Sequence, residues 1–147
     1  MQDKYTVDNI KTIKLILVDD NLSFRSALGK LLKIQYACNI IAEASNGAEF
    51  LNLQCISDAD LIFMDLMMPV MDGFKAARQI NIQEPSLKII AVTMHYEKVY
   101  LNELIKNGFK GCLFKTTIFE KIIDAIITVM NGNYFFPDEI KNVIPEK

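Results

Sequence analysis

The stretch LIFMDLMMPVMDG, residues 61–73, joins an apolar run to a single carboxylate and to a loop shaped by proline and glycine. The run at 61–64 is apolar throughout, as expected for a strand that is buried on both faces of a parallel sheet. Asp65 therefore falls at the carboxyl end of such a strand, where open α/β sheets bind ligands. Alone, this position fits either a functional acid or a polar residue that ends the strand.

Three further apolar runs also end in polar side chains. They are KLILV (14–18), followed by Asp19 and Asp20; KIIAV (88–92), followed by Thr93; and GCLF (111–114), followed by Lys115. Parallel strands bring their carboxyl ends to the same edge of a sheet, so we expect these four side chains and Asp65 to converge there. Three acids, a hydroxyl and an ammonium at one edge favour a functional site.

Strand-like and helix-like patterns alternate over residues 14–130. Apolar residues at the 3.6-residue period predict one helix around residues 24–32 and another over 118–129. Between them we predict strands at 39–44, 61–65, 88–93 and 111–115, and helices at 48–56, 74–82 and 97–107. Together with a first strand at 14–18, these patterns predict an α/β fold with helices on both faces of a parallel sheet.

Local signals mark the helix ends and the domain limits. Thr117 and Glu120 have the spacing of a capping box, and Gly108 and Gly132 stand where helices commonly end in glycine. We interpret residues 1–13 as a polar N-terminal tail with at most one loose turn, 14–132 as the domain, and 133–147 as a C-terminal tail or the start of a linker.

Composition favours one domain in a reducing compartment. The 147 residues are enough for a single core, and the formal net charge of -2 argues against unspecific binding of nucleic acid by this chain. The three cysteines, Cys38, Cys55 and Cys112, lack CxxC spacing and lie in or beside apolar segments, which favours buried thiols in the cytoplasm. No apolar run approaches the ~20 residues that cross a bilayer, so we expect no membrane segment.

Three carboxylates at one edge repel one another by about 4 kcal/mol per pair at ~4 Å and an effective dielectric constant near 20. Mg²⁺, which prefers oxygen ligands and keeps several waters, relieves that repulsion. Asp20 and Asp65 suit it as ligands, with Asp19 and a loop carbonyl in support. A free oxygen of Asp65 can then attack phosphorus, while Thr93 and Lys115 hold phosphoryl oxygens. The set therefore predicts phosphorylation of an aspartate.

At these residues the chain resembles the response-regulator receiver domain of two-component signalling. The motifs that carry the resemblance are VDDN (18–21), MDLMMPVMDG (64–73), VTM (92–94) and LFK (113–115), within a match that spans 14 to about 132. The stretches VTMHYEKVYLNELIKNGFKGCLFK and NGNYFFPDEI most resemble the NarL/LuxR class. The resemblance implies a doubly wound five-stranded sheet of strand order 2-1-3-4-5, described as flavodoxin-like or CheY-like, in a phosphoacceptor signalling domain and not an enzyme.

The resemblance also assigns a role to each site residue. It implies Asp65 as phosphoacceptor, Asp20 as direct Mg²⁺ ligand, Asp19 as ligand through water, the Met67 backbone carbonyl as a further ligand, Thr93 as switch hydroxyl and Lys115 as phosphate-binding lysine. The implied partners are a histidine kinase or phosphotransfer protein and a second copy of the chain. In the NarL/LuxR class a linker and a DNA-binding domain that controls transcription usually follow; the alternative is a stand-alone receiver in a phosphorelay.

Two positions depart from the family pattern. Receivers usually have Tyr or Phe three positions before the lysine, as a ring that moves on phosphorylation, whereas this chain has Cys112. We expect Cys112 to be a small buried core residue and the switch to involve mainly the loop at 93–96. The family lysine is also commonly followed by a cis proline. Thr116 follows Lys115 here, so we expect a trans peptide bond.

Rival functions predict other patterns. A haloacid-dehalogenase-type enzyme has its nucleophile on the first strand in a DxD pattern and its paired acids late, the reverse of the order here. A flavin-binding module needs a phosphate loop after the first strand, where DDNLSF would repel phosphate. A degenerate receiver that only binds proteins would not need all five site residues, although Cys112 keeps this interpretation open. We interpret His95, the single histidine, as a surface residue and not a catalyst.

Overall fold

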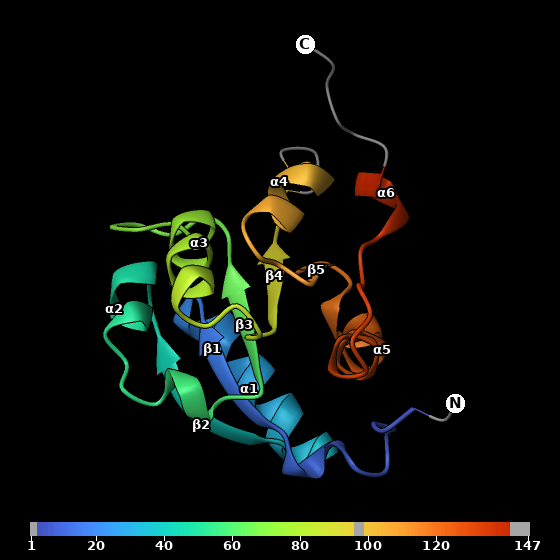
Figure 1. Cartoon of the computed structure of the whole chain (residues 1–147). Coiled ribbons are helices and arrows are strands. Elements are labelled where there is room, and N and C mark those ends of the chain that lie inside the picture. The colour runs from blue at the N-terminus through green and yellow to red at the C-terminus, as the bar shows by residue number, and fades with distance from the viewer. Residues whose placement is uncertain (1–2, 96–98, 142–147) are drawn as a thin grey trace.

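A five-stranded parallel sheet forms the centre of the computed structural model, which describes residues 3–95 and 99–141 (Figure 1). Its strands are β1 (Lys14–Val18), β2 (Asn39–Ala44), β3 (Leu61–Asp65), β4 (Ile89–Thr93) and β5 (Gly111–Phe114). Their order is β2-β1-β3-β4-β5, and each neighbouring pair is parallel. The predicted fold class and strand order are confirmed.

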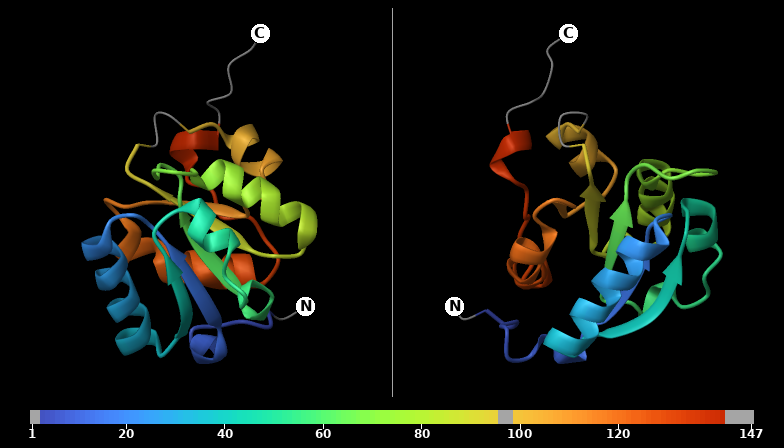
Figure 2. Two further views of the ribbon diagram at one scale, coloured as in Figure 1. Left: turned by 90° about the vertical axis from the view of Figure 1, so that its left-hand side faces the viewer. Right: turned by 180° about the vertical axis from the view of Figure 1, so that it is seen from behind.

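Helices cover both faces of this sheet (Figures 1 and 2). They are α1 (Leu22–Tyr36), α2 (Gly47–Leu51), α3 (Gly73–Gln83), α4 (Leu101–Lys106), α5 (Ile118–Met130) and the short α6 (Asp138–Lys141), with 3-10 turns η1 (Ile10–Thr12) and η2 (Ile56–Asp58). Because successive side chains of a strand point to opposite faces, β1 supplies two separate cores. Leu15 and Leu17 pack in the core with α1 and α5, whereas Ile16 and Val18 pack in the core with α2, α3 and α4.

The second helix is shorter than the predicted 48–56. Asn46 caps its start by accepting a hydrogen bond from the Glu49 N–H, but the helix ends at Leu51. The Leu53 N–H donates to the Phe50 carbonyl at 3.0 Å, and the chain then turns into η2. This early end allows Ile56 to enter the core, where it is 5% exposed.

The fourth helix also starts later than the predicted residue 97. Tyr100 has extended backbone angles (φ -114°, ψ 139°), and α4 begins at Leu101. Tyr96, predicted in the switch loop, and Glu97, predicted in this helix, lie outside the described residues.

The predicted capping box of the last long helix is wrong. Thr117 stands at the N-cap of α5, but its ψ of 10° departs from the extended geometry that lets a side chain reach the first helical N–H groups. The Glu120 N–H instead donates to the Thr117 backbone carbonyl at 3.1 Å. The helix-ending glycines are confirmed, since Gly108 and Gly132 have φ values of 93° and 91°.

The N-terminal segment packs on the domain. Ile10 and Ile13 are 0% and 1% exposed in the core that α1 and α5 cover. The backbone of Tyr5 exchanges two hydrogen bonds with the Asn131 side chain, at 2.9 and 3.0 Å, beyond the end of α5. Residues 5–13 therefore pack against the rest of the domain. The domain boundary at residue 14 stays a prediction.

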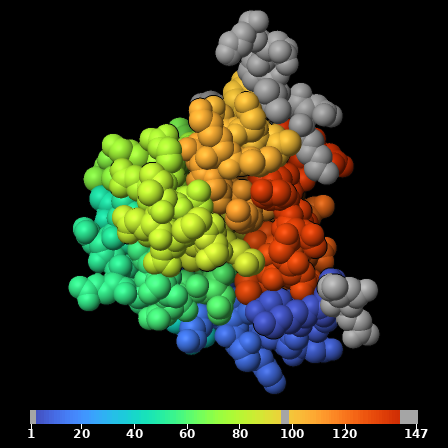
Figure 3. Space-filling model, viewed as in Figure 1, coloured from blue at the N-terminus to red at the C-terminus, as the bar shows by residue number. Residues whose placement is uncertain are grey.

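The C-terminal segment covers the open edge of β5. The Phe135 N–H donates to the Lys110 carbonyl at 3.0 Å, and its carbonyl accepts from the Cys112 N–H at 2.9 Å. Ile140 is fully buried in the core that also contains Leu104 of α4. Figure 3 shows this segment, in red, directly against α4, in orange. Strand pairing and apolar contact thus fix residues 135–140 on the domain.

Among residues 3–95 and 99–141, no helix is both long and apolar enough to cross a membrane, and no peptide bond is cis. The bond between Lys115 and Thr116 is therefore trans, as predicted. All three cysteines are free thiols, of which Cys38 and Cys112 are buried.

Candidate functional site

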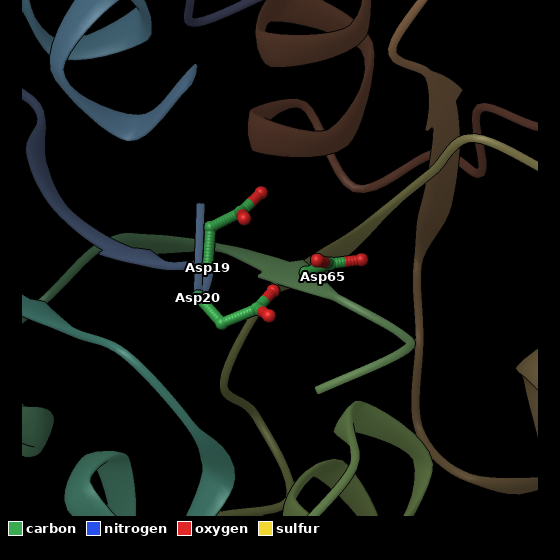
Figure 4. A group of neighbouring side chains, drawn as sticks. All are labelled: Asp19, Asp20 and Asp65. Carbon is green, nitrogen blue, oxygen red and sulfur yellow. The ribbon is translucent and has the colours of Figure 1, made fainter. Parts of the chain in front are cut away.

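Three carboxylates converge at the carboxyl edge of the sheet, as the strand ends predicted. Asp19 and Asp20 directly follow β1, and Asp65 ends the neighbouring strand β3. One oxygen of each lies within 4.8 Å of the others, and Figure 4 shows the three side chains beside one another at the ends of these two strands. Asp19 and Asp65 are buried, whereas Asp20 is exposed, so the cluster opens to solvent on one side.

Lys115 lies between the two buried acids. It follows β5, and its Nζ is 2.8 Å from Asp19 Oδ2 and 3.4 Å from Asp65 Oδ2. Its side chain is only 10% exposed, so the ion pairs are shielded from water. One cation among three acids leaves the cluster with excess negative charge.

Burial and this excess charge both affect the ionisation of Asp65. Burial, and next the charge of Asp19, raise the pKa of Asp65 to about 7, against an ordinary value of 3.8. Lys115 and the Met67 N–H, which donates to Asp65 Oδ1 at 3.3 Å, lower it in part. Because a nearby cation favours the ionised form, a bound divalent ion would return Asp65 to the carboxylate.

Thr93 ends β4 at the same edge and is buried. Its Oγ1 accepts a hydrogen bond from the His95 N–H at 3.1 Å, and its carbonyl accepts from the Lys115 N–H at 2.8 Å. The strand register pairs Asp65 with Val92, so Thr93 lies one position beyond the acid on the neighbouring strand. The hydroxyl and the lysine are thus tied to the same edge as the acids.

Cys112 lies inside β5, three residues before Lys115. It is fully buried, and this burial raises the pKa of its thiol to about 12. The side chain is therefore a neutral, apolar group at physiological pH, in agreement with the predicted small core residue.

The loop after Asp65 requires glycine at position 73. A Cβ there would lie 2.2 Å from the Asp65 carbonyl oxygen, and the Gly73 N–H donates to the Leu66 carbonyl at 3.0 Å. Val70, at the exposed turn of the loop, has a φ of 70°, which β-branched residues rarely adopt. The loop folds tightly back on the end of β3 and so fixes the backbone beside Asp65.

Three neighbouring residues were not predicted as part of the site. The Asn21 N–H donates to Asp19 Oδ1 at 2.8 Å, and Arg25 donates from Nη1 to the Asp19 carbonyl and from Nε to Glu43 at 2.7 Å. The Phe24 ring centroid is 4.5 Å from Lys115 Nζ. An Asn before an amphipathic stripe is a helix N-cap signal that marks Asn21, but spacing alone assigned Phe24 to the core, and nothing in the pattern marked Arg25.

Comparison with known proteins agrees with this geometry. The family model described as "Response regulator receiver domain" matches residues 15–127. The transcriptional regulatory protein YdfI of Bacillus subtilis (strain 168) is 34% identical over 131 residues, which are 88% of this chain and 61% of YdfI. LnrK, another transcriptional regulatory protein of that strain, is 30% identical over 128 residues, or 87% of this chain and 58% of LnrK. The chain thus spans about three fifths of the length of these relatives.

Solved structures share the fold. A LuxR-family two-component response regulator from Aurantimonas sp. SI85-9A1 superposes with a TM-score of 0.78 at 24% identity, over 88% of this chain and 92% of that one. The RcsB chain of a complex of two RcsB dimers bound to two parallel DNAs gives 0.77 at 23% identity, over 88% of this chain and 66% of that one.

Proposed function

The chain belongs to the response-regulator receiver domain family, and we propose that it is a receiver of the NarL/LuxR class that accepts a phosphoryl group on Asp65. The observation that carries this proposal is the contact of Lys115 with both Asp19 and Asp65 at the edge where the acids gather. Asp65 is buried, as Asp19 is, but it alone of the three acids lies on the central strand β3, and its other oxygen accepts a hydrogen bond from the Met67 N–H. The donor is the phosphohistidine of a kinase or phosphotransfer protein.

In this reaction an oxygen of Asp65 forms a bond to phosphorus while the phosphorus–nitrogen bond of the donor breaks. The freed imidazole nitrogen takes up a proton. Lys115 and the Thr93 hydroxyl contact the transferred phosphoryl oxygens by charge-assisted and neutral hydrogen bonds. Small donors such as acetyl phosphate substitute for the protein donor, with acetate as the leaving group.

The acidic cluster fits Mg²⁺, because its donors are all oxygens and the charge of the three acids exceeds that of Lys115. Asp20 and Asp65 would bind the ion directly, Asp19 through water, and Met67 through its backbone carbonyl. When bound, Mg²⁺ neutralises charge on the incoming phosphoryl group and on Asp65. The exposure of Asp20 supports entry of the ion from that side.

The phosphoacceptor assignment is tested by incubation with acetyl phosphate and Mg²⁺, followed by intact mass measurement. Wild type gains the mass of one phosphoryl group, Asp65→Asn gains none, and the control Asp124→Asn, an exposed acid on α5, behaves like wild type. Equal gain by wild type and Asp65→Asn would contradict the assignment.

The metal assignment is tested separately by isothermal titration with Mg²⁺. Asp20→Ala and Asp65→Asn each weaken binding, since each removes a direct carboxylate ligand. Undiminished affinity in Asp20→Ala would show that the ion binds elsewhere.

Phosphorylation is proposed to act on α4 without a moving ring at Cys112. A ring that moves from an exposed to a buried position stabilises the active form by ~25 cal/mol for each Å² of apolar surface that it buries. Cys112 is already fully buried, so its thiol does not supply this free energy. Cys112→Tyr is therefore expected to strengthen the response of α4. Amide exchange of residues 101–106 with and without beryllofluoride measures it in both proteins. A full response in wild type that the tyrosine variant does not increase would assign the switch to another residue.

The output is proposed to be transcriptional, because YdfI and LnrK are transcriptional regulatory proteins. Phosphorylation, which adds about two negative charges to the site, then shifts the receiver towards a dimer, as the resemblance to the NarL/LuxR class implies. Sedimentation with and without beryllofluoride tests this step. An unchanged monomer at high concentration would favour the alternative, a receiver that relays phosphoryl groups to another protein.

A further inference from the structure

The aromatic ring of Phe24 lies over the ammonium group of Lys115. The distance from Nζ to the ring centroid is 4.5 Å, well within the ~6 Å over which a ring attracts a cation. Asp19 and Asp65 contact the same Nζ at 2.8 and 3.4 Å. The lysine is therefore held by two carboxylates and one aromatic ring.

The turn that follows Asp19 also fixes the backbone of Phe24. Asn21 accepts a hydrogen bond from the Phe24 N–H at 3.0 Å through its side chain, and its own N–H donates to Asp19 Oδ1. On the other side, the ring of Phe119 in the first turn of α5 lies 6.5 Å from that of Phe24. Phe24 is thus held by a hydrogen bond at the start of α1 and by a ring contact with α5, the helix that follows Lys115.

A ring holds an ammonium differently from an acid. A further carboxylate would bind the lysine by a hydrogen bond and add to the negative charge around Asp65. The ring attracts the cation through its quadrupole, accepts no strong hydrogen bond, and excludes water from that side. The N–H donors of the ammonium therefore stay available to oxygens, which include those of Asp19 and Asp65.

We propose that Phe24 is a positioning residue, whose ring holds Lys115 against Asp65 so that the ammonium is in place when the phosphoryl group arrives. This rests on the proposed function of Asp65 as phosphoacceptor. Phe24→Leu removes the ring and keeps an apolar side chain. Phe24→Tyr keeps the ring. Tyr134→Leu is the matched control, because Tyr134 lies 5.9 Å from Lys110 Nζ at the opposite end of β5.

The position of the lysine is measured by NMR of its side-chain methylene protons, assigned with Lys115→Arg. Protons over a ring face are shifted upfield, so we expect this shift in wild type and Phe24→Tyr and its loss in Phe24→Leu. The same shift in wild type and Phe24→Leu would overturn the proposal. This measurement involves no phosphoryl transfer, so it tests the placement of the Phe24 ring over Lys115 even if wild type accepts no phosphoryl group and the proposed function fails.

The effect on the reaction is measured as the rate of phosphorylation by acetyl phosphate with Mg²⁺. The rate for Phe24→Leu is expected to be lower by about 3- to 30-fold. This is the fold-change that corresponds to the free energy of a cation–ring attraction at a part-buried site. Phe24→Tyr and Tyr134→Leu keep rates close to wild type. A wild-type rate in Phe24→Leu, or equal loss in Phe24→Tyr, would overturn the proposal. If Phe24→Leu does not fold, Phe24→Met, also without a ring, replaces it in both measurements.

Discussion

Replacing Asp65 by asparagine should stabilise the metal-free protein at neutral and alkaline pH. Burial and the charge of Asp19 raise the pKa of Asp65 from 3.8 to about 7 in the folded state. An acid whose pKa is raised on folding binds its proton more tightly in the native state than in the unfolded chain. The favourable contribution of Asp65 to the free energy of unfolding is therefore complete below about pH 4 and is lost as the pH rises through about 7. Asparagine has the same shape and carries no charge at any of these pH values.

The magnitude follows from the size of the shift. About three pKa units at 1.36 kcal/mol each give about 4 kcal/mol, and solvent screening through the open side at Asp20 reduces this to about 2–4 kcal/mol at about pH 8. At about pH 4.5 the gain falls to about 1 kcal/mol or less, because native Asp65 is then already neutral. The substitution does not remove the other partner of Lys115, Asp19, whose Oδ2 lies 2.8 Å from Nζ.

Urea unfolding of wild type and Asp65→Asn in the presence of EDTA, at both pH values, measures these differences. All other ionisable groups are shared, so the change of the difference with pH isolates Asp65. Added Mg²⁺ should raise the stability of wild type at about pH 8 and reduce the advantage of the variant. Equal differences at both pH values, or destabilisation by Asp65→Asn at about pH 8, would refute the electrostatic account of this site.

Three further substitutions test the packing around the site, each by thermal or urea unfolding. Gly73→Ala should destabilise the fold by about 2–4 kcal/mol, because the added Cβ would clash with the Asp65 carbonyl oxygen. The control Gly29→Ala, whose Cβ would have its nearest contact at 3.5 Å, should stabilise the fold by about 0.5–1 kcal/mol. Val70→Asn should gain about 1 kcal/mol, because Asn tolerates a positive φ; a loss would show that the Val70 side chain makes a needed contact. Ile140→Ala should lose about 2–4 kcal/mol, and an unchanged stability would mean that the C-terminal segment does not pack on α4 in solution.

The sheet and the acidic edge were predictable from the sequence because each relies on a local pattern. Each of four apolar runs stops at the polar residue that ends a strand, and parallel strands must then share an edge. Asp19, Asp20 and Asp65 are therefore found together without knowledge of any long-range contact. All five strands were predicted to within one residue, and four of them, β1, β3, β4 and β5, are buried apolar runs whose bounds have little freedom.

The helix ends and the surroundings of Lys115 depend on contacts that local patterns do not encode. The second helix ends early because Ile56 packs into the core, which the apolar spacing of 48–56 does not reveal. Phe24 has the spacing of a core residue, and only the meeting of α1 with the end of β5 brings its ring over the lysine. Phe135 pairs with β5, but it lies in a short aromatic run, residues 134–136, whose sequence does not distinguish it from an ordinary linker.

The central claim, that Asp65 carries the phosphoryl group, is tested most directly by locating the modification in the chain. After incubation with acetyl phosphate and Mg²⁺, borohydride reduces an aspartyl phosphate to homoserine, which tandem mass spectrometry of peptides identifies by position. We predict homoserine at position 65 in wild type, dependent on Mg²⁺, and none at positions 19 and 20. Homoserine at position 19 or 20, or its absence from position 65 in a phosphorylated sample, would contradict the account.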